Sequence, residues 1–351
     1  MESKRDQRVA VMLFVVTLAS VFLVYGYQWM GGDPLSDSAT AIGSAKFAGA
    51  LMAILLAHEM GHYLVAKRHG FSLSLPYFIP FPSAFGTLGA VIRLKSLPES
   101  RTALLEMGAA GPLAGFAVAV VVLCFGLPNT IEHQMPQMIL MWPPAEVAAV
   151  AEPGKLDLVL GWLFSHPPLS WLVGGTEPGS VQMMILANPL IMDIIGSIVL
   201  GGAPGRYAEL DPFATAGWVG CLLTGINLIP IGSLDGGHIV NAAFPTLSRR
   251  ITKFCLILAF LGAYLWVGWL VWAGILALIG ATYSTPAPKR PPLSARAKWV
   301  SALVLVAFGL SFMPAPVEID TLQLDELEVF DLDGNKVPIE DLQAWMESQQ
   351  S

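Results

Sequence analysis

Long apolar stretches alternate with short polar segments along most of this chain. The first stretch extends from Val9 to Met30, the second from Gly43 to Arg68 and the third from Arg101 to Leu127. A helix needs about 20 mainly apolar residues to cross the hydrocarbon core of a bilayer. We therefore predict that the chain crosses a membrane three times within these stretches.

The later apolar stretches are shorter or are interrupted. Residues 254–283 are apolar and lie between two segments that carry basic residues. Basic loops mark one side of a membrane, so this stretch is expected to cross an even number of times. We predict a hairpin of two short helices that turns near Gly268, with one long tilted helix as the alternative. A last span is predicted from Trp299 to Met313.

Charged and aromatic residues indicate how the first spans are oriented. Basic residues precede the first span and follow the second, and Trp29 lies at the far end of the first. These basic residues are Lys4, Arg5, Arg8, Lys67 and Arg68. Because basic flanks stay in the cytoplasm, we predict a first span that runs outward and a second span that returns. The apolar run after Arg8 is longer than a signal-peptide core, so we expect it to be retained.

Composition supports a polytopic protein with the lipid bilayer as its surroundings. Hydrophobic residues make up 54% of the 351 residues and charged residues only 13%, whereas a soluble domain has about 25% charged residues. The net charge of −7 is uneven, because the chain from Pro314 onward has ten acids and one lysine, which gives −9 and leaves +2 for the rest. This acidity lies in the tail and argues against nucleic-acid binding. The three cysteines lie in apolar segments without CxxC spacing, which is typical of core residues.

Residues 71–100 are apolar, but their prolines and glycines disfavour a continuous helix. The alternating pattern of residues 86–93 predicts an extended hairpin that ends at Arg93 and enters the membrane from the cytoplasmic side. Irregular backbone at this depth needs partners from the protein or from a wet cavity. Its unpaired strand edges are able to pair with an extended peptide. A plain packing loop is the alternative.

Residues 128–180 are rich in proline and glycine, with several acids and Lys155 as their basic residue. This composition is typical of an external loop. We predict that residues 128–210 form a cap of short interfacial helices that does not cross the membrane. Within the third span, residues 108–115 contain several small residues, which favour close packing between helices.

A short motif inside the second span carries two histidines and a carboxylate. His58 and His62 are four residues apart, so a helix presents both on one face. Two neutral imidazoles at this spacing are able to hold one zinc ion, and Glu59 is placed to take a proton from water there. Ionisable residues are costly inside a bilayer, which favours a functional site. A chance HExxH match is the alternative.

A second motif lies in an interrupted helix near residue 235. Pro230 and Gly232 break the helical pattern after Asn227, and Asp235 follows the break. Discontinuous transmembrane helices line binding sites because their free backbone groups need partners. If this span runs inward, Asp235 reaches the depth of the histidines and can be the third metal ligand. A helix cap or a turn residue is the alternative.

Three other residues are further candidates. Glu106 and Asp193 are alternative carboxylate ligands if Asp235 is not one. His238 is either a residue that supports a ligand or a histidine at a helix end. Two histidines and one carboxylate would leave a fourth position open, as in catalytic zinc sites.

Together, the motifs HEMGH, GPLAG and NLIPIGSLDGGH resemble those of the site-2 protease family of intramembrane zinc metalloproteases. The likeness covers roughly residues 43–245. The segments PYFIPFP, FGTLGAVIR and GWVGCLLTGINLIP are most similar to the branch without a PDZ domain that bacteria, archaea and chloroplasts share.

The resemblance implies roles for five residues. His58, His62 and Asp235 would bind zinc, and Glu59 would be the catalytic base. Asn227 matches the asparagine that donates a hydrogen bond to the substrate or oxyanion, although leucine rather than proline follows it here.

We therefore predict an all-α polytopic membrane protein with a core of three transmembrane helices and a re-entrant β-hairpin, flanked by further transmembrane helices. Its expected parts are a first transmembrane segment (1–30), a metalloprotease core (43–245), C-terminal transmembrane helices (246–313) and an acidic tail (314–351).

The predicted function is zinc-dependent hydrolysis of peptide bonds in or near the transmembrane helices of membrane-protein substrates. The expected location is the cell (inner) membrane, with the active site in its cytoplasmic half. Alternatives are a catalytically inactive scaffold, a metal transporter, and a protease that trims soluble peptides at the cytoplasmic face. A transporter is expected to contain internal repeats, and the sequence contains none that we recognise.

Overall fold

The computed structural model describes residues 4–71, 73–92, 100–133, 137–139, 180–266, 268–282, 293–323, 328–330 and 336–338. The chain divides into two units. The helical unit consists of Met1–Ile131, Asn188–Pro204 and Leu210–Pro316, and the smaller unit consists of Glu132–Ala187, Gly205–Glu209 and Val317–Ser351. Arg93, the predicted end of the hairpin, and residues 140–179 of the predicted cap lie outside the described residues.

Three helices of the helical unit are long and apolar enough to cross a membrane. They are α1 (Lys4–Val24), which a π-helical turn continues to Trp29, α2 (Ser38–Arg68), and α3 (Arg101–Gly126), which a 3₁₀ turn continues to Asn129. With a rise of 1.5 Å per residue, the 31 residues of α2 extend about 46 Å. The three predicted spans are therefore confirmed as helices of spanning length.

The second helix begins earlier than its hydrophobicity predicts. It starts at Ser38 instead of Gly43, because the side chain of Asp37 accepts hydrogen bonds from the backbone N–H groups of Ala39 and Thr40. A side-chain acceptor at this position satisfies N–H groups that have no partner inside the helix. A capping residue thus adds a polar first turn to an apolar span.

Shorter helices follow in the rest of the described chain. They are α6 (Leu190–Val199), α7 (Pro212–Asn227), α8 (Asp235–Ala243), α9 (Ser248–Gly262), α10 (Gly268–Thr282) and α11 (Ala295–Ser311). The helices α9 and α10 pack against each other, which confirms the predicted hairpin of two short helices. The alternative prediction of one long tilted helix is wrong. The ten residues of α6 extend about 15 Å, too short for a crossing, so α6 agrees with a cap that does not span the membrane.

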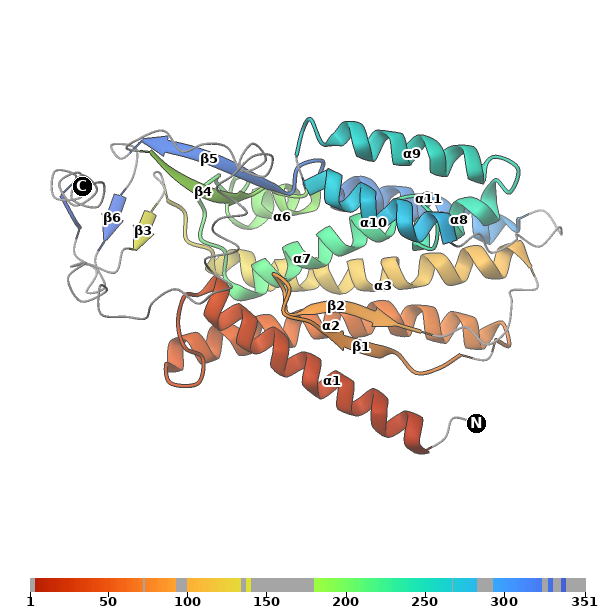
Figure 1. Ribbon diagram of the computed structural model, residues 1–351, viewed down its shortest axis with the longest axis horizontal. Helices are drawn as coiled ribbons and strands as arrows, with labels where there is room; N and C mark the ends of the chain where they lie inside the picture. Colours follow the sequence, from red (N-terminus) through yellow and green to blue (C-terminus); the bar gives the residue numbers. More distant parts are fainter. Residues whose placement is uncertain are drawn as a thin grey trace. The chain divides into compact units, whose positions relative to one another are not determined.

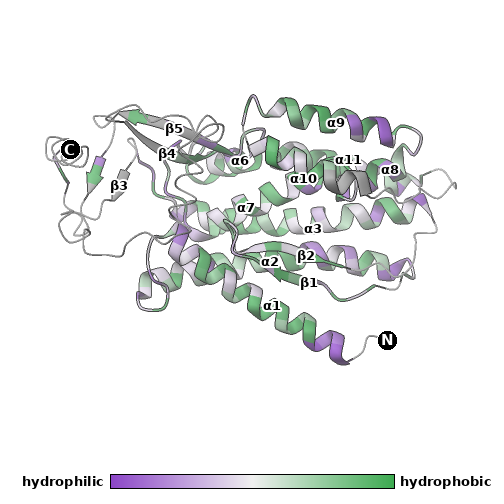
Figure 2. Cartoon of the chain, in the orientation of Figure 1, coloured by the Kyte–Doolittle hydropathy of each residue, from purple (hydrophilic) through white to green (hydrophobic). Residues whose placement is uncertain are grey.

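The helices α2, α3, α7 and α8 pack against one another and form the core of the helical unit (Figure 1). Leu51, Leu105 and Trp218 are completely buried in it, whereas Val11 and Phe125 are 63% and 69% exposed. Figure 2 shows hydrophobic residues along most of the length of the helices and hydrophilic residues near helix ends. Exposed apolar surface of this extent is typical of helices that face lipid.

Residues 77–91 form the predicted hairpin. The strand β1 (Tyr77–Pro80) pairs antiparallel with β2 (Thr87–Val91), and the register is irregular between Phe78 and Pro80. Gly86 precedes β2 with a φ of +76°, a backbone conformation that favours glycine. The hairpin is thus confirmed as a paired structure, whereas its entry into the membrane stays a prediction.

The first helix supports this hairpin from one side. Ser20 Oγ donates a hydrogen bond to the carbonyl oxygen of Gly86 at 2.7 Å, and Trp29 Nε1 donates one to the carbonyl oxygen of Ala84 at 2.7 Å. Both contacts join α1 to the turn of the hairpin. The sequence pattern did not indicate this support, because it depends on contacts between segments that are far apart in the chain.

The smaller unit contains two pairs of strands among its described residues. Parallel strands β3 (Gln137–Ile139) and β6 (Glu328–Phe330) form one pair, and antiparallel strands β4 (Ser180–Leu186) and β5 (Val317–Gln323) form the other. Arg206 makes ion pairs with Glu318 and Asp320 of β5. The expectation of an all-α protein is therefore wrong for this unit. In each pair, one strand precedes α6 in the sequence and the other follows α11. No local sequence pattern therefore reveals the pairing.

Candidate metal centre

The second transmembrane helix places two imidazoles side by side. His58 and His62 are one turn apart on α2, and the centroids of their rings lie 4.8 Å apart. The Nε2 atoms of the two rings are 3.1 Å apart. Both nitrogens therefore face the same small space beside α2.

A break between α7 and α8 brings a carboxylate to this space. The helix α7 ends at Asn227 and α8 begins at Asp235, and Gly232 between them has a φ of +53°. Asp235 Oδ2 lies 3.2 Å from His58 Nε2, and Asp235 Oδ1 lies 3.3 Å from His62 Nε2. The predicted helix break is confirmed, and Asp235 lies with the two histidines.

A backbone carbonyl of α3 fixes the orientation of the His62 ring. His62 Nδ1 lies 2.8 Å from the carbonyl oxygen of Met107. Because a carbonyl group only accepts hydrogen bonds, Nδ1 carries the proton and donates it. In the neutral ring this leaves the lone pair on Nε2, which faces Asp235 and His58, and that is the tautomer that metal binding through Nε2 requires.

Glycines of α3 allow the close approach of this helix to the histidines. A Cβ atom added at Gly111 would lie 2.0 Å from His62 Nε2, and one at Gly115 would lie 3.1 Å from the Cβ atom of His58. Gly108, on the same face of α3, packs against the first turns of α8. One face of α3 therefore supports all three candidate ligands.

The three donor atoms fit a zinc ion. One donor atom from each of His58, His62 and Asp235 lies within 4.8 Å of the other two. Zinc holds histidine nitrogen and carboxylate oxygen at about 2.0–2.2 Å, so neighbouring donors of a tetrahedral site are about 3.3 Å apart. The two nitrogens are 3.1 Å apart, and each lies 3.2 or 3.3 Å from the nearer of the two Asp235 oxygens, which is close to this spacing. Two nitrogens and one oxygen are also the donors of many catalytic zinc sites.

The two other predicted site residues differ in their relation to these donors. Glu59 is 8% exposed, and its carboxylate interacts electrostatically with both histidines and with Asp235. Asn227 is partly buried at the end of α7, and among the described residues no hydrogen bond joins its side chain to the three donors. The structure brings Glu59 and the three donors together, whereas the functional role of each residue stays a prediction.

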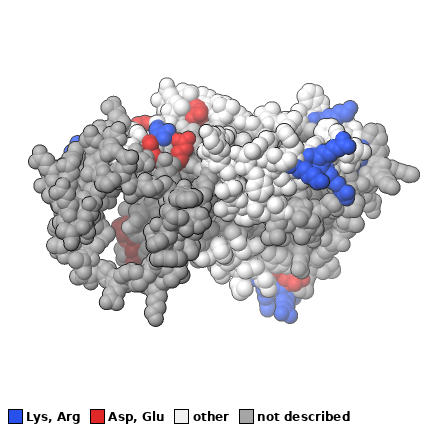
Figure 3. Space-filling model, turned by 45° about the horizontal axis from the view of Figure 1, so that its top comes forward, with Lys and Arg blue, Asp and Glu red and all other residues white. Residues whose placement is uncertain are grey.

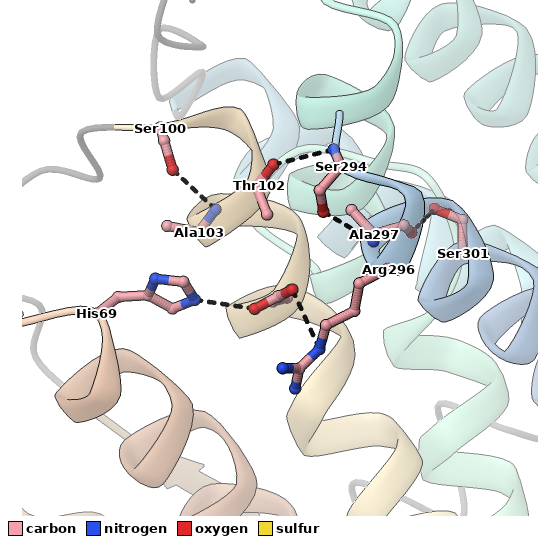
Figure 4. Close-up of polar contacts among 9 residues, drawn as sticks. His69, Ser100, Thr102, Ala103, Ser294, Arg296, Ala297 and Ser301 are labelled. Atoms are coloured by element: carbon pink, nitrogen blue, oxygen red, sulfur yellow. Dashed lines mark hydrogen bonds and ion pairs between the residues drawn. The ribbon is translucent and has the colours of Figure 1, made fainter. Parts of the chain in front are cut away.

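The alternative carboxylates do not reach the histidine pair. Glu106 accepts a hydrogen bond from His69 Nε2 at 2.9 Å and lies 3.5 Å from Arg296 Nε (Figure 4). This cluster joins the residue that follows α2 to α3 and α11 near one end of the helical unit. Asp193 lies on α6 and does not belong to the donor group found among the described residues.

Met107 and Gly111 are the neighbours of the ligands that the sequence did not identify. The small residues of α3 predicted close helix packing only. Their spacing at positions 108, 111 and 115 does place them on one helix face. That spacing does not distinguish a face that packs against a helix from one that packs against a ligand side chain.

The chain is similar to several curated proteins. It is 30% identical over 268 residues to the probable zinc metalloprotease EGY1, chloroplastic, of Arabidopsis thaliana, which covers 74% of this chain and 40% of that protein. It is 30% identical over 277 residues to EGY2 of the same plant, covering 75% and 42%. The EGY2 protein of Oryza sativa subsp. indica is 32% identical over 209 residues, covering 58% and 30%. The chain thus spans less than half the length of these relatives, and no solved structure matches it.

The family comparison covers the region that contains the site. Residues 46–267 match the profile of peptidase family M50. This match includes all five predicted site residues, from His58 to Asp235. The chain therefore belongs to peptidase family M50, which confirms its resemblance to the site-2 proteases.

Proposed function

We propose that this chain is a zinc metalloprotease that cleaves peptide bonds in or near the transmembrane helices of membrane proteins. The observation that carries the proposal is the meeting of His58, His62 and Asp235, from two separate segments of a membrane helical unit. Membership of peptidase family M50 supports it, and the relatives are named as probable zinc metalloproteases. The chain covers less than half the length of those relatives, so the support for the activity comes from its own residues.

The chemistry divides between the metal and the residues around it. His58, His62 and Asp235 hold the zinc ion, which when bound supplies Lewis acidity that lowers the pKa of water to about 7 and polarises a carbonyl group. Glu59 accepts the proton of the attacking water and then donates it to the nitrogen of the leaving amine. A C–O bond forms, the C–N bond breaks, and Glu59 ends the cycle ionised as it began.

Asn227 supplies a hydrogen-bond donor in this proposal. Its side-chain amide donates to the carbonyl oxygen of the substrate as negative charge develops there. The position of Asn227 at the end of α7, directly before the break that leads to Asp235, supports this role. One donor of this kind typically contributes about 10²–10³ to the rate.

A substrate helix must unwind before cleavage, because its peptide groups are engaged in hydrogen bonds inside the helix. The hairpin is suited to hold the unwound chain. Its sheet has two strands among the described residues, and β2 contacts α2, the helix of His58. A peptide that adds to β2 gains main-chain hydrogen bonds and lies extended beside α2.

We place the protein in the cell (inner) membrane, as a multi-pass protein with its site in the cytoplasmic half. In Figure 1, the start of α1, the end of α2 and the starts of α3 and α11 lie at the same end of the helical unit. All four carry basic residues, and basic segments face the cytoplasm. His62 is six residues from Arg68 at this end, or about 9 Å of helix.

The experiment that tests the proposal compares wild-type protein with Glu59→Gln. Both are reconstituted in bilayers, and zinc content and cleavage of a transmembrane test substrate are measured. We expect both to bind one zinc ion per chain and Glu59→Gln to lose at least about 10²-fold in cleavage rate. A His58→Ala control is expected to lose zinc and cleavage together.

Other outcomes distinguish the alternatives. Cleavage at the wild-type rate by Glu59→Gln with zinc bound means that Glu59 is not the base. Cleavage of soluble peptides alone means that the intramembrane assignment is wrong. Zinc binding without cleavage of either substrate by the wild type favours a scaffold or a transporter.

A further inference from the structure

The part of the chain that follows Asp235 carries an unbalanced positive charge. Residues 236–317 contain seven Lys and Arg residues and no Asp or Glu. Arg249, Arg250 and Lys253 are exposed in the first turns of α9, and among the described residues none of them has an acidic partner. Figure 3 shows Lys and Arg side chains gathered toward the right of the view, the side on which α9 begins in Figure 1. Phosphate groups have the complementary charge.

These cations lie at the N-terminal end of an exposed apolar stripe on α9. Phe254, Ile257 and Leu261 are 60%, 57% and 66% exposed along α9. Residues four apart share one side of a helix, so Arg250 precedes Phe254 and Lys253 precedes Ile257 on the same surface. Charge followed by an apolar stripe is the order of groups in a phospholipid, from its headgroup to its acyl chain.

We propose that the start of α9 binds the headgroup of an anionic phospholipid, with an acyl chain along the stripe from Phe254 to Leu261. The guanidinium forks of Arg249 and Arg250 suit the oxygens of a phosphate, and Lys253 adds a point charge. Each basic residue near an anionic membrane surface strengthens association roughly fivefold. This lipid site does not depend on the proposed protease activity.

The same turn of α9 contacts the segment that leads to Asp235. Thr252 Oγ1 donates a hydrogen bond to the carbonyl oxygen of Pro230 at 3.2 Å. Further along α9, Ala259 belongs to a buried cluster with Ile229 and Ile231. A headgroup that orders the start of α9 therefore steadies the helix break. If the proposed function holds, anionic lipid raises the rate of cleavage.

Binding is tested on full-length protein in phosphatidylcholine bilayers, with spin-labelled phosphatidylglycerol as the probe. Electron paramagnetic resonance measures the fraction of label that the protein immobilises. The test variant is Arg249→Gln/Arg250→Gln/Lys253→Gln, and the matched control is Lys4→Gln/Arg5→Gln/Arg8→Gln. The control removes the same charge from the exposed start of α1, which lies far from α9 in Figure 1.

We expect the α9 variant to lose at least about fivefold in selectivity for the anionic label, and the α1 control to change little. High salt should weaken the selectivity of the wild type, because exposed charges are screened, and this measurement needs no substitution. Circular dichroism and zinc content check that both variants fold.

Coupling to the site is tested with Thr252→Val, which removes the hydrogen bond to Pro230 and leaves the three cations. We expect unchanged lipid selectivity, but loss of the stimulation of cleavage by phosphatidylglycerol. The conservative variant Thr252→Ser retains the hydroxyl and is expected to retain the stimulation.

Two results would overturn the lipid site. Equal loss of selectivity in both triple variants means that only the total charge matters. Displacement of the label by inorganic phosphate means that the surface is a site for free anions. Absence of cleavage in every bilayer, with the lipid selectivity intact, would instead refute the proposed protease function.

Discussion

A single added methyl group at position 111 is expected to weaken zinc binding strongly. In Gly111→Ala the new Cβ atom would lie 2.0 Å from Nε2 and 2.4 Å from Cδ2 of His62. Ordinary contacts begin at 3.4 Å, so the imidazole or α3 must move by about 1.4 Å. Metal sites tolerate departures of about 0.2 Å in ligand distances. We therefore expect at least about 100-fold weaker zinc binding, or about 2.8 kcal/mol.

The assay uses metal-free, full-length protein titrated with Co²⁺, whose visible absorption reports the ligand geometry, followed by competition with zinc. Two further glycine variants are compared with Gly111→Ala, because their added Cβ atoms meet less or nothing. In Gly115→Ala the added atom lies 3.1 Å from the nearest atom of His58, so a shift of a few tenths of an ångström relieves the contact, and we expect at most about tenfold weaker binding. In Gly49→Ala nothing lies within 4 Å, and we expect no change.

Wild-type zinc affinity in Gly111→Ala would refute the reasoning, because it would mean that α3 does not lie against His62 as described. General unfolding is distinguished from a local effect by circular dichroism of the same samples. The order of affinities is the second check, since Gly49→Ala should bind zinc better than Gly115→Ala, and Gly115→Ala better than Gly111→Ala.

Arg101→Gln should lower the free energy of unfolding in mixed micelles by about 2 kcal/mol, because the guanidinium donates hydrogen bonds to the last two carbonyl groups of α8 at 2.7 and 2.8 Å. Gly86→Ala should increase hydrogen exchange in β1 and β2 more than Gly89→Ala does, because both positions have positive φ but only the Cβ at residue 86 would meet the backbone of α1, at 2.6 Å. Hydrogen bonds from Thr40 hold the pKa of the Asp37 carboxyl below its ordinary value of 3.8. The contribution of this cap to stability is therefore complete above pH 3.8 and is lost as the pH falls through the lower pKa of the folded state. Hydrogen exchange of the amides at the start of α2 should show this loss in the wild type but not in Asp37→Asn. Unchanged unfolding, equal exchange in the two glycine variants, or an acid step that persists in Asp37→Asn would contradict the respective contact.

The residues that the structure brings together at the candidate site were visible in the sequence because ionisable residues are rare in membrane helices. Within apolar spans, His58 and Asp235 stand out, and the resemblance of their motifs to a protease family linked them across the chain. The hairpin of α9 and α10 followed from the placement of basic residues alone. These features depend on composition and local spacing, which a sequence displays directly.

Features that depend on contacts between distant segments were not predictable. The carbonyl of Met107 carries no side-chain signal, and Gly111 is one small residue among several. The strands β4 and β5 pair with each other, although the helices α6 to α11 lie between them in the sequence. Asn227 was predicted from its motif, and its role stays a prediction.

The segment that supports the hairpin lies before the residues that match the family profile. Ser20 belongs to α1 and Trp29 to the π-helical turn that continues it, whereas the family match begins at residue 46. The metal ligands and the residues that support the hairpin are therefore encoded in separate stretches of the gene. In the proposed protease, substitutions along α1 would change how the hairpin holds a peptide while His58, His62 and Asp235 stay the same.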